Sequence, residues 1–283
     1  MEKVYQLGLY EKAMPSSLSY EEALRTAAKC GFDFVEISVD ETDEKLKRLD
    51  YSRTEIQRLN NIMSETGICF RSMCLSGHRK YPLGSMDEKI RSKSLEIMEK
   101  AVVLASALGI RIIQLAGYDV YYEQGNEETK NFFASNLQKA VDMAAKAGIM
   151  LGFETMETEF MDTTEKAMHY VKAIHSPYLG VYPDLGNITN AACKYKTDVL
   201  SDLETGRGHL IAMHLKETVP GKYREIPFGT GHVDFEGGIQ KAWQLGVRRF
   251  VAEMWYTGNP SWENDIRDAH AMLSAILDKQ QTG

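Results

Sequence analysis

The stretch Leu151-Gly152-Phe153-Glu154 decides the fold. Its first three residues are typical of a buried parallel strand, and the carboxylate that follows them would lie at the C-terminal end of that strand. In a barrel of eight parallel strands and eight helices, these strand ends open onto the catalytic face. The stretch therefore predicts one strand of an α/β fold, a (β/α)8 TIM barrel, with an acidic group at its mouth.

The same arrangement recurs three times further along the chain, where a polar residue follows a short apolar run. The polar residue is Asp184 after residues 179–183, His214 after residues 210–213 and Glu253 after residues 249–252. From Glu154 onward these residues are 30, 30 and 39 positions apart, and each step is about the length of one strand with its helix. Two Glu, one Asp and one His are therefore expected to converge on one mouth.

The rest of the chain has the alternation of strand and helix patterns that a parallel barrel needs. Earlier strands are predicted at residues 4–9, 32–39, 68–75 and 110–115. Helices are predicted at residues 20–30, 52–66, 86–108, 127–147, 163–175, 235–245 and 262–279, with a helix-rich segment from 184 to 203. Loops are expected at 40–44, 76–85 and 216–234. The 283 residues fit a single barrel domain spanning 1–283.

Composition and charge narrow the class of partner. The formal net charge is −7 and the pI about 5.6, the wrong balance for a protein that binds nucleic-acid phosphates. The four cysteines form no CxxC pair, as expected for reduced thiols in a cytoplasmic enzyme. The N-terminal residues lack a sustained apolar core, and the longest apolar run is far short of a bilayer span. We therefore expect no signal peptide and no membrane, and a small molecule as the partner.

Each residue of this quartet, taken alone, has an ordinary structural explanation. A lone Glu or Asp after a strand is often a helix cap, and a lone His after an apolar run is often a hydrogen-bonded interior group. Buried charged groups from adjacent strands, however, are costly unless a cation holds them together. Three carboxylates and one imidazole suit one divalent metal ion, and Zn²⁺, Mn²⁺, Co²⁺ and Mg²⁺ all remain open. We predict a metal site at Glu154, Asp184, His214 and Glu253.

The quartet also predicts a type of chemistry. Four protein ligands on an octahedral metal leave room for two substrate oxygens, which fits a chelated hydroxy-ketone. Glu154 and Glu253, on opposite sides of such a substrate, could each reach one face of a carbon between the carbonyl and hydroxyl groups. One would remove a proton, the other would return a proton from the far side, and the metal would stabilise the enediolate.

Several longer stretches give the sequence a family resemblance. They are Leu7–Ala13, Phe32–Glu36 with Val39–Glu44, Ser72–Ser76 with His78–Arg79, Gln114–Tyr122, Tyr182–Asn187, His214–Lys216, Pro227–Gly229 and Glu253–Trp255. Through them the chain resembles the L-xylulose 5-phosphate 3-epimerases of bacterial ascorbate catabolism, also labelled hexulose-6-phosphate isomerases, within the xylose-isomerase-like TIM barrels. The resemblance implies a metal-dependent isomerase of carbohydrate metabolism that interconverts L-xylulose 5-phosphate and L-ribulose 5-phosphate at C3. It also implies that the quartet binds the metal and that Glu154 and Glu253 are the catalytic acid/base pair.

A departure from related enzymes agrees with a phosphorylated substrate. The related ketose 3-epimerases of free sugars have a His three residues after the metal Asp, where this chain has Asn187, and an Arg after the metal His that is missing at that spacing here. A sugar phosphate needs cationic side chains some distance from the metal. The predicted substrate and phosphate contacts are His78, Arg79, Gln114, Asn187, Lys216, Lys222 and Arg224.

Three other hypotheses remain open from the sequence. A hexulose-6-phosphate or other aldose–ketose phosphate isomerase would use the same site on a neighbouring carbon. A metal-dependent nuclease for abasic DNA shares the fold, but it would need more than the seven His and a less acidic charge than −7. A non-catalytic sugar-phosphate binding protein would not need the intact quartet. The aromatic loop at 116–122 is compatible with a homodimer.

Overall fold

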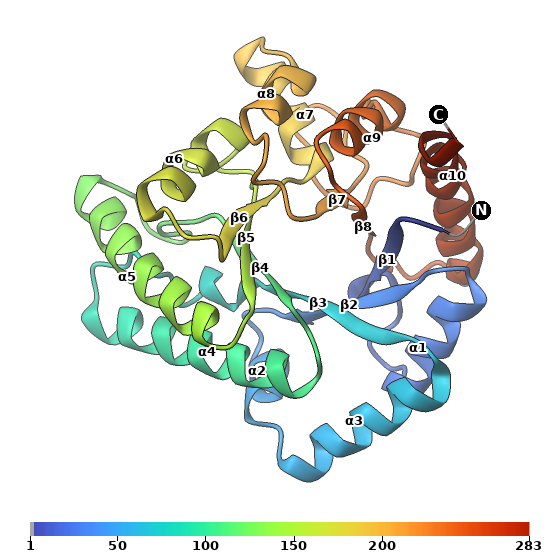
Figure 1. Ribbon diagram of the computed structural model, residues 1–283, viewed down its shortest axis with the longest axis horizontal. Helices are drawn as coiled ribbons and strands as arrows, with labels where there is room; N and C mark the ends of the chain where they lie inside the picture. Colours follow the sequence, from blue (N-terminus) through green and yellow to red (C-terminus); the bar gives the residue numbers. More distant parts are fainter. Residues whose placement is uncertain (1–2, 283) are drawn as a thin grey trace.

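The computed structural model describes residues 3–282 and shows a ring of helices around a barrel of eight strands (Figure 1). The strands are β1 (Gln6–Tyr10), β2 (Phe34–Val39), β3 (Cys69–Leu75), β4 (Ile112–Ala116), β5 (Met150–Glu154), β6 (Leu179–Tyr182), β7 (Met213–Leu215) and β8 (Arg249–Ala252). They pair in parallel in the order β6-β5-β4-β3-β2-β1-β8-β7. Isolated bridges Val181↔Leu210 and Asp184↔His214 link β6 to the β7 segment. The predicted (β/α)8 fold is confirmed.

The helices that cover the barrel begin where the sequence places capping residues. They are α1 (Tyr20–Lys29), α3 (Arg53–Thr66), α4 (Glu88–Ala107), α5 (Glu127–Lys146), α6 (Thr164–Ile174), α7 (Leu185–Tyr195), α8 (Val199–Thr205), α9 (Phe235–Gln244) and α10 (Trp262–Thr282). Ser19 with Glu22, and Ser52 with Glu55, form capping boxes at the starts of α1 and α3. Gly67 ends α3 at φ 74°, a conformation that glycine adopts without strain. The predicted strands and helices have the right order and lie close to these bounds.

Two of the expected loops contain short helices. The helix α2 (Asp43–Leu46) starts inside the acidic segment 40–44, where the Thr42 hydroxyl accepts the Lys45 N–H. The 3-10 helix η3 (Ser76–Arg79) begins segment 76–85, and similar turns, η1 (Glu11–Ala13) and η2 (Lys47–Asp50), follow β1 and α2. The expectation of plain loops is wrong here, because a single helical turn is too short to show apolar periodicity in the sequence.

The apolar core has two layers on either side of the strands. A small cluster lies inside the barrel and consists of Tyr10, Phe34, Cys74, Ile112, Tyr182, Ala212 and Val251. A much larger cluster packs the strands against the surrounding helices. Gly8 leaves room for the Phe34 ring, which a Cβ at position 8 would overlap. The barrel interior is therefore packed, and a site can form only at an end of it.

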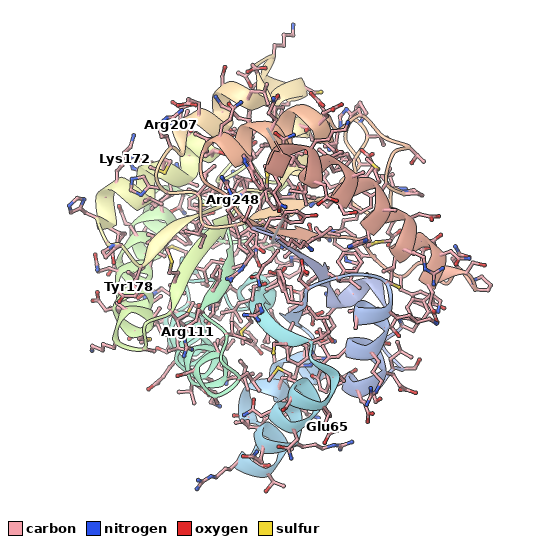
Figure 2. The ribbon with its side chains drawn as sticks, turned by 45° about the vertical axis from the view of Figure 1, so that its right-hand side comes forward. Glu65, Arg111, Lys172, Tyr178, Arg207 and Arg248 are labelled. Atoms are coloured by element: carbon pink, nitrogen blue, oxygen red, sulfur yellow. The ribbon has the colours of Figure 1, made fainter. Side chains whose placement is uncertain are left out.

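The two ends of the barrel carry different residues. Arg111, Tyr178 and Arg248 directly precede β4, β6 and β8, so they mark the amino-terminal end (Figure 2). The quartet lies at the opposite, C-terminal ends of the strands. No helix within residues 3–282 is long and apolar enough to cross a bilayer.

Candidate metal centre and active site

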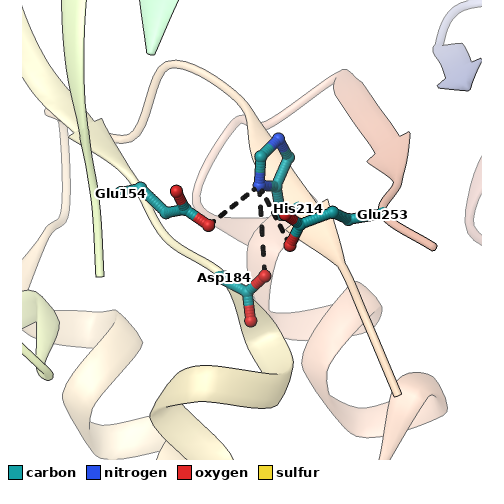
Figure 3. A group of neighbouring side chains, drawn as sticks. All are labelled: Glu154, Asp184, His214 and Glu253. Atoms are coloured by element: carbon teal, nitrogen blue, oxygen red, sulfur yellow. Dashed lines mark hydrogen bonds and ion pairs between the residues drawn. The ribbon is translucent and has the colours of Figure 1, made fainter. Parts of the chain in front are cut away.

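The four predicted ligands come together at the C-terminal mouth of the barrel (Figure 3). Glu154 is the last residue of β5, His214 lies in β7, and Glu253 directly follows β8. Asp184 precedes α7 and caps it, because its Oδ1 accepts the Asn187 N–H at 2.6 Å. All four side chains are buried, and one ligand atom from each lies within 4.8 Å of the others.

The His214 ring is held between carboxylates. Its Nδ1 lies 3.3 Å from Glu154 Oε1, 3.5 Å from Glu253 Oε2 and 4.0 Å from Asp184 Oδ2, as the dashed lines in Figure 3 mark. Its Nε2 lies 2.6 Å from Glu36 Oε1 on the other side. Nδ1 therefore points into the quartet, while Nε2 is oriented by a carboxylate, the arrangement common among metal-binding histidines.

Crowding of acidic groups changes the acid–base properties of the quartet. Burial and the neighbouring Glu253 raise the pKa of Glu154, and burial raises the pKa of Asp184 well above its usual value. Burial acts in the same direction on Glu253, but Lys216 and His214 outweigh it and lower the Glu253 pKa to about 2. Burial works against the charged form of His214, yet Glu36 and Glu253 overcome it and raise the His214 pKa. The three carboxylates therefore need a nearby cation in order to be charged together.

Lys216 supplies part of this positive charge. Its ammonium is buried, with Nζ 3.0 Å from Asp184 Oδ2 and 3.2 Å from Glu253 Oε2. Three carboxylates and one ammonium leave a net charge of −2, which one divalent cation would neutralise. The structure does not support Lys216 as a phosphate contact, because its ammonium is already engaged in the quartet.

The donor set fits a divalent metal ion. Asp184 Oδ2 and Glu253 Oε2 are buried, and within the described residues neither accepts a hydrogen bond of regular geometry. Lys216 is the ammonium beside both oxygens, but one ammonium does not balance three buried carboxylates, so a further cation is favoured here. Carboxylate oxygens with one imidazole nitrogen are donors that Zn²⁺, Mn²⁺, Co²⁺ and Mg²⁺ can take. The quartet can therefore hold one divalent metal ion, as predicted.

Two buried polar residues hold the quartet from outside. Glu36, in β2, accepts hydrogen bonds from Ser72 Oγ at 2.6 Å and Tyr182 OH at 3.0 Å, besides its contact with His214. Gln114, in β4, donates through Nε2 to Glu154 Oε2, while its Oε1 has no partner in the described part of the chain. Gln114 therefore orients Glu154, and its substrate contact stays a prediction.

We expect Glu36→Gln to weaken metal binding roughly 10- to 100-fold, because the charge that orients the His214 ring is lost. Titration of the metal-free protein with Co²⁺ or Mn²⁺ in a calorimeter measures this directly. Tyr182→Phe is the matched control, since it removes one neutral donor to Glu36 and leaves the carboxylate in place. Equal metal affinities in Glu36→Gln and the wild type would show that the Glu36 contact does not orient a metal ligand.

Three of the predicted substrate contacts lie beside the quartet. Arg79, Asn187 and Arg224 line a cavity of about 50 Å³ together with Glu154 and Glu253. Asn187 donates through Nδ2 to the Thr155 carbonyl at 2.7 Å, and its buried Oδ1 has no partner within residues 3–282. The structure therefore brings these three side chains to the mouth where a substrate would enter.

Two other predicted phosphate contacts lie elsewhere. His78 is buried, its Nε2 lies 3.1 Å from the Ser94 carbonyl oxygen of α4, and burial lowers its pKa to about 4. A neutral ring bound to a helix backbone is not a phosphate ligand, so the structure does not support this role. Lys222 is exposed and is not among the residues that line the small cavity. The basic composition of a loop did not show which of its side chains point inward.

Other residues that line the small cavity were not predicted as site residues. They include Lys12, Glu157 and Trp255. A cavity of about 480 Å³ adjoins it and shares Lys216, Glu253 and Trp255. Another of about 730 Å³ extends toward α1 and α3 and shares Lys12 and Trp255. Lys12 is a cation at this mouth, with its Nζ 2.5 Å from Asp40 Oδ2.

Comparisons with known proteins agree with this geometry. Residues 24–276 match the model of the xylose isomerase-like TIM barrel family. The chain belongs to this family. It is 45% identical over 256 residues to the L-ribulose-5-phosphate 3-epimerase UlaE of Shigella boydii serotype 18, covering 90% of this chain and 89% of that one. The family resemblance seen in the sequence is confirmed.

Solved structures share the fold at low sequence identity. A D-tagatose 3-epimerase-like protein matches with a TM-score of 0.81 and 19% identity over 98% of each chain. An L-ribulose 3-epimerase matches with a TM-score of 0.79 and 16% identity, covering 98% of this chain and 96% of that one. These similarities cover nearly the whole chain. They show that its fold occurs in solved structures.

Proposed function

We propose that this chain is a metal-dependent 3-epimerase that interconverts L-ribulose 5-phosphate and L-xylulose 5-phosphate. The observation that carries the proposal is the 45% identity, over 90% of the chain, to a protein named L-ribulose-5-phosphate 3-epimerase. The site geometry supports the same conclusion, because two buried glutamates, Glu154 and Glu253, flank a donor set that fits one divalent ion.

In this proposal Glu154 and Glu253 transfer the protons. They extend from β5 and β8, so they approach a substrate at the mouth from different sides of the barrel. One glutamate, as a carboxylate, removes the proton from C3 and becomes a carboxylic acid, and negative charge moves onto the C2 oxygen to give an enediolate. The other glutamate, as a carboxylic acid, delivers its proton to the opposite face of C3 and becomes a carboxylate. A divalent ion in the quartet would supply Lewis-acid stabilisation of that negative charge. Gln114 orients Glu154, and Lys216 keeps Glu253 charged.

The phosphate end of the substrate is assigned to Arg79 and Arg224. Both guanidinium groups line the cavity that contains the two glutamates. Arginine is suited to phosphate because it offers several donors in a fixed plane and stays charged. Among the predicted cations these two lie beside the quartet without being part of it.

An assay with matched substrates tests the proposed function. The metal-loaded protein is given L-ribulose 5-phosphate or L-ribulose, and the C3 epimer of each is measured. We expect a kcat/KM at least about 100-fold higher for the phosphate ester, since charged hydrogen bonds to phosphate contribute that much. Equal turnover of both sugars would overturn the assignment of a phosphorylated substrate.

We expect Arg79→Gln to raise KM for L-ribulose 5-phosphate roughly ten-fold with a smaller change in kcat, because a charged contact to a remote phosphate group is lost. Steady-state kinetics measure both parameters. Lys222→Gln is the control, because it removes an exposed cation that is not among the residues lining the cavity. If Lys222→Gln raised KM as much as Arg79→Gln, overall charge rather than a phosphate contact would explain the effect.

A further inference from the structure

An acidic side chain contacts one of the two arginines assigned to the phosphate and lines the same cavity as the other. Glu157 follows β5 by three residues and lines the same small cavity as Arg79 and Arg224. Its Oε1 accepts a hydrogen bond from Arg224 Nη2 at 3.2 Å. The Arg79 guanidinium stacks over the Tyr121 ring, 4.7 Å from its centroid, and Tyr121 OH in turn lies 3.3 Å from Glu157 Oε1. Glu157 thus contacts Arg224 directly and is linked to Arg79 through Tyr121.

Glu157 is held in this position by neutral donors as well. Tyr118 OH donates to Glu157 Oε2 at 2.7 Å. Burial works to raise the Glu157 pKa, but Tyr118, Arg224 and Arg79 outweigh it and keep the pKa below its usual value. The carboxylate is therefore an anion at neutral pH, held by hydrogen bonds and positive charges of the kind that a phosphate group would need.

The arginines are not saturated by this contact. Arg79 Nε is buried without a hydrogen-bond partner in the described chain. The nearest acidic atom in an ion pair with Arg79 is Glu41 Oε1, 3.8 Å from Nη1, which is too far for a hydrogen bond. The Arg79 guanidinium therefore keeps a donor available for an anion, and Glu157 does not take it.

The small cavity is tight for such an anion beside Glu157. Its volume of about 50 Å³ is small, whereas sites for small molecules usually occupy roughly 300 Å³ or more. The adjoining cavity of about 480 Å³ offers room for the rest of a sugar phosphate, but its phosphate group would have to lie against the wall that Glu157 shares with Arg79 and Arg224. Glu157 is the side chain that a phosphate would replace there, because its hydrogen bond with Arg224 would give way to one with the phosphate.

We propose that Glu157 is an internal competitor for the phosphate site, a carboxylate that pairs with Arg224, beside Arg79, until the phosphate group of the substrate displaces it. The inference rests on the proposed function for the identity of the substrate. A dianionic phosphate can replace a carboxylate at a guanidinium group, whereas the hydroxyl of an unphosphorylated sugar cannot. Glu157 would thus help to exclude free sugars, which makes it a specificity-determining residue.

Calorimetric titration of the metal-loaded protein with inorganic phosphate tests the proposal. Glu157→Gln keeps the size and hydrogen-bonding shape of the side chain but removes the competing charge. We expect it to bind phosphate about three-fold more tightly than the wild type, the gain expected when a partly exposed ion pair no longer has to be broken. Glu159→Gln is the matched control, because it removes an equal charge from the same loop at an exposed side chain paired with Lys194.

A double-mutant cycle makes the test specific. In an Arg224→Gln background, Glu157→Gln should give no gain, since the competition takes place at that guanidinium. Unchanged or weaker phosphate binding in Glu157→Gln would overturn the proposal and assign Glu157 to positioning Arg224. An equal gain in Glu159→Gln would also overturn it, because the effect would then be one of overall charge.

The proposed function is tested separately, by turnover of L-ribulose 5-phosphate in the wild type. Tighter phosphate binding in Glu157→Gln together with no turnover in the wild type would support the competitor and reject the epimerase. Normal turnover in the wild type with no gain in Glu157→Gln would do the reverse.

Discussion

Glu154→Gln and Glu253→Gln are each expected to turn over L-ribulose 5-phosphate about 10³-fold more slowly than the wild type, because each variant loses one of two proton-transferring carboxylates. Both residues belong to the quartet, so metal content must be measured beside kcat. Gln retains a side-chain oxygen as a weaker ligand, and metal is supplied in excess. Glu159→Gln, on an exposed part of the loop after β5, is expected to keep wild-type activity.

Isotope exchange separates the roles of the two glutamates. With one base left, each variant should still exchange the C3 hydrogen of one epimer with solvent and should fail to form the other epimer. Glu154→Gln and Glu253→Gln should therefore exchange opposite epimers. Near-normal epimerisation by either variant, with metal bound, would contradict two-base proton transfer.

Removal of the metal is expected to abolish activity and to lower the melting temperature by roughly 5–10 °C. The physical reason is that Glu154, Asp184 and Glu253 are buried together, and Lys216 alone leaves them with a net charge of −2. Chelation followed by dialysis, with melting followed by circular dichroism, measures the effect. Adding back Mn²⁺, Co²⁺, Zn²⁺ or Mg²⁺ one at a time then ranks the metals.

Asp184→Asn provides the control for this experiment. Asp184 also caps α7, and Asn is as good an N-cap as Asp, so the substitution removes a charged ligand while it keeps the cap. The melting temperature of this variant should respond little to added metal. Full activity after verified removal of metal would contradict a metal-dependent reaction.

The quartet could be predicted from the sequence because it depends on local patterns. Glu154 ends β5, Asp184 and Glu253 follow β6 and β8, and His214 lies within the short strand β7. The C-terminal ends of parallel strands meet at one mouth. Lys216 could have been placed there too. It lies two residues after His214, and side chains two apart on a strand point to the same side. A lone basic residue predicts a phosphate contact, but three buried carboxylates nearby are stronger partners for its ammonium.

Other parts of the site depend on contacts that no local pattern contains. Glu36 and His214 are in contact although they are 178 positions apart in the sequence. The folding of the strands into a barrel brings β2 and β7 close enough for this contact. Glu157 acquires its partners from two other loops, Tyr118 and Tyr121 from the loop after β4 and Arg224 from the loop after β7. The basic loop around His78 predicts a cation at the surface, whereas the tertiary structure buries the ring against α4. Strand ends are thus predictable, and side-chain directions in long loops are not.

Proton NMR of L-ribulose 5-phosphate with the metal-loaded protein in D₂O distinguishes epimerisation from isomerisation. We expect deuterium to enter at C3 as L-xylulose 5-phosphate appears, because the enediolate formed by one glutamate is protonated by the carboxylic acid of the other, which has exchanged with the solvent. Exchange at C1 with formation of an aldose would contradict the epimerase and identify an aldose–ketose isomerase. No exchange at any carbon would leave a metal-binding barrel whose substrate is a different molecule.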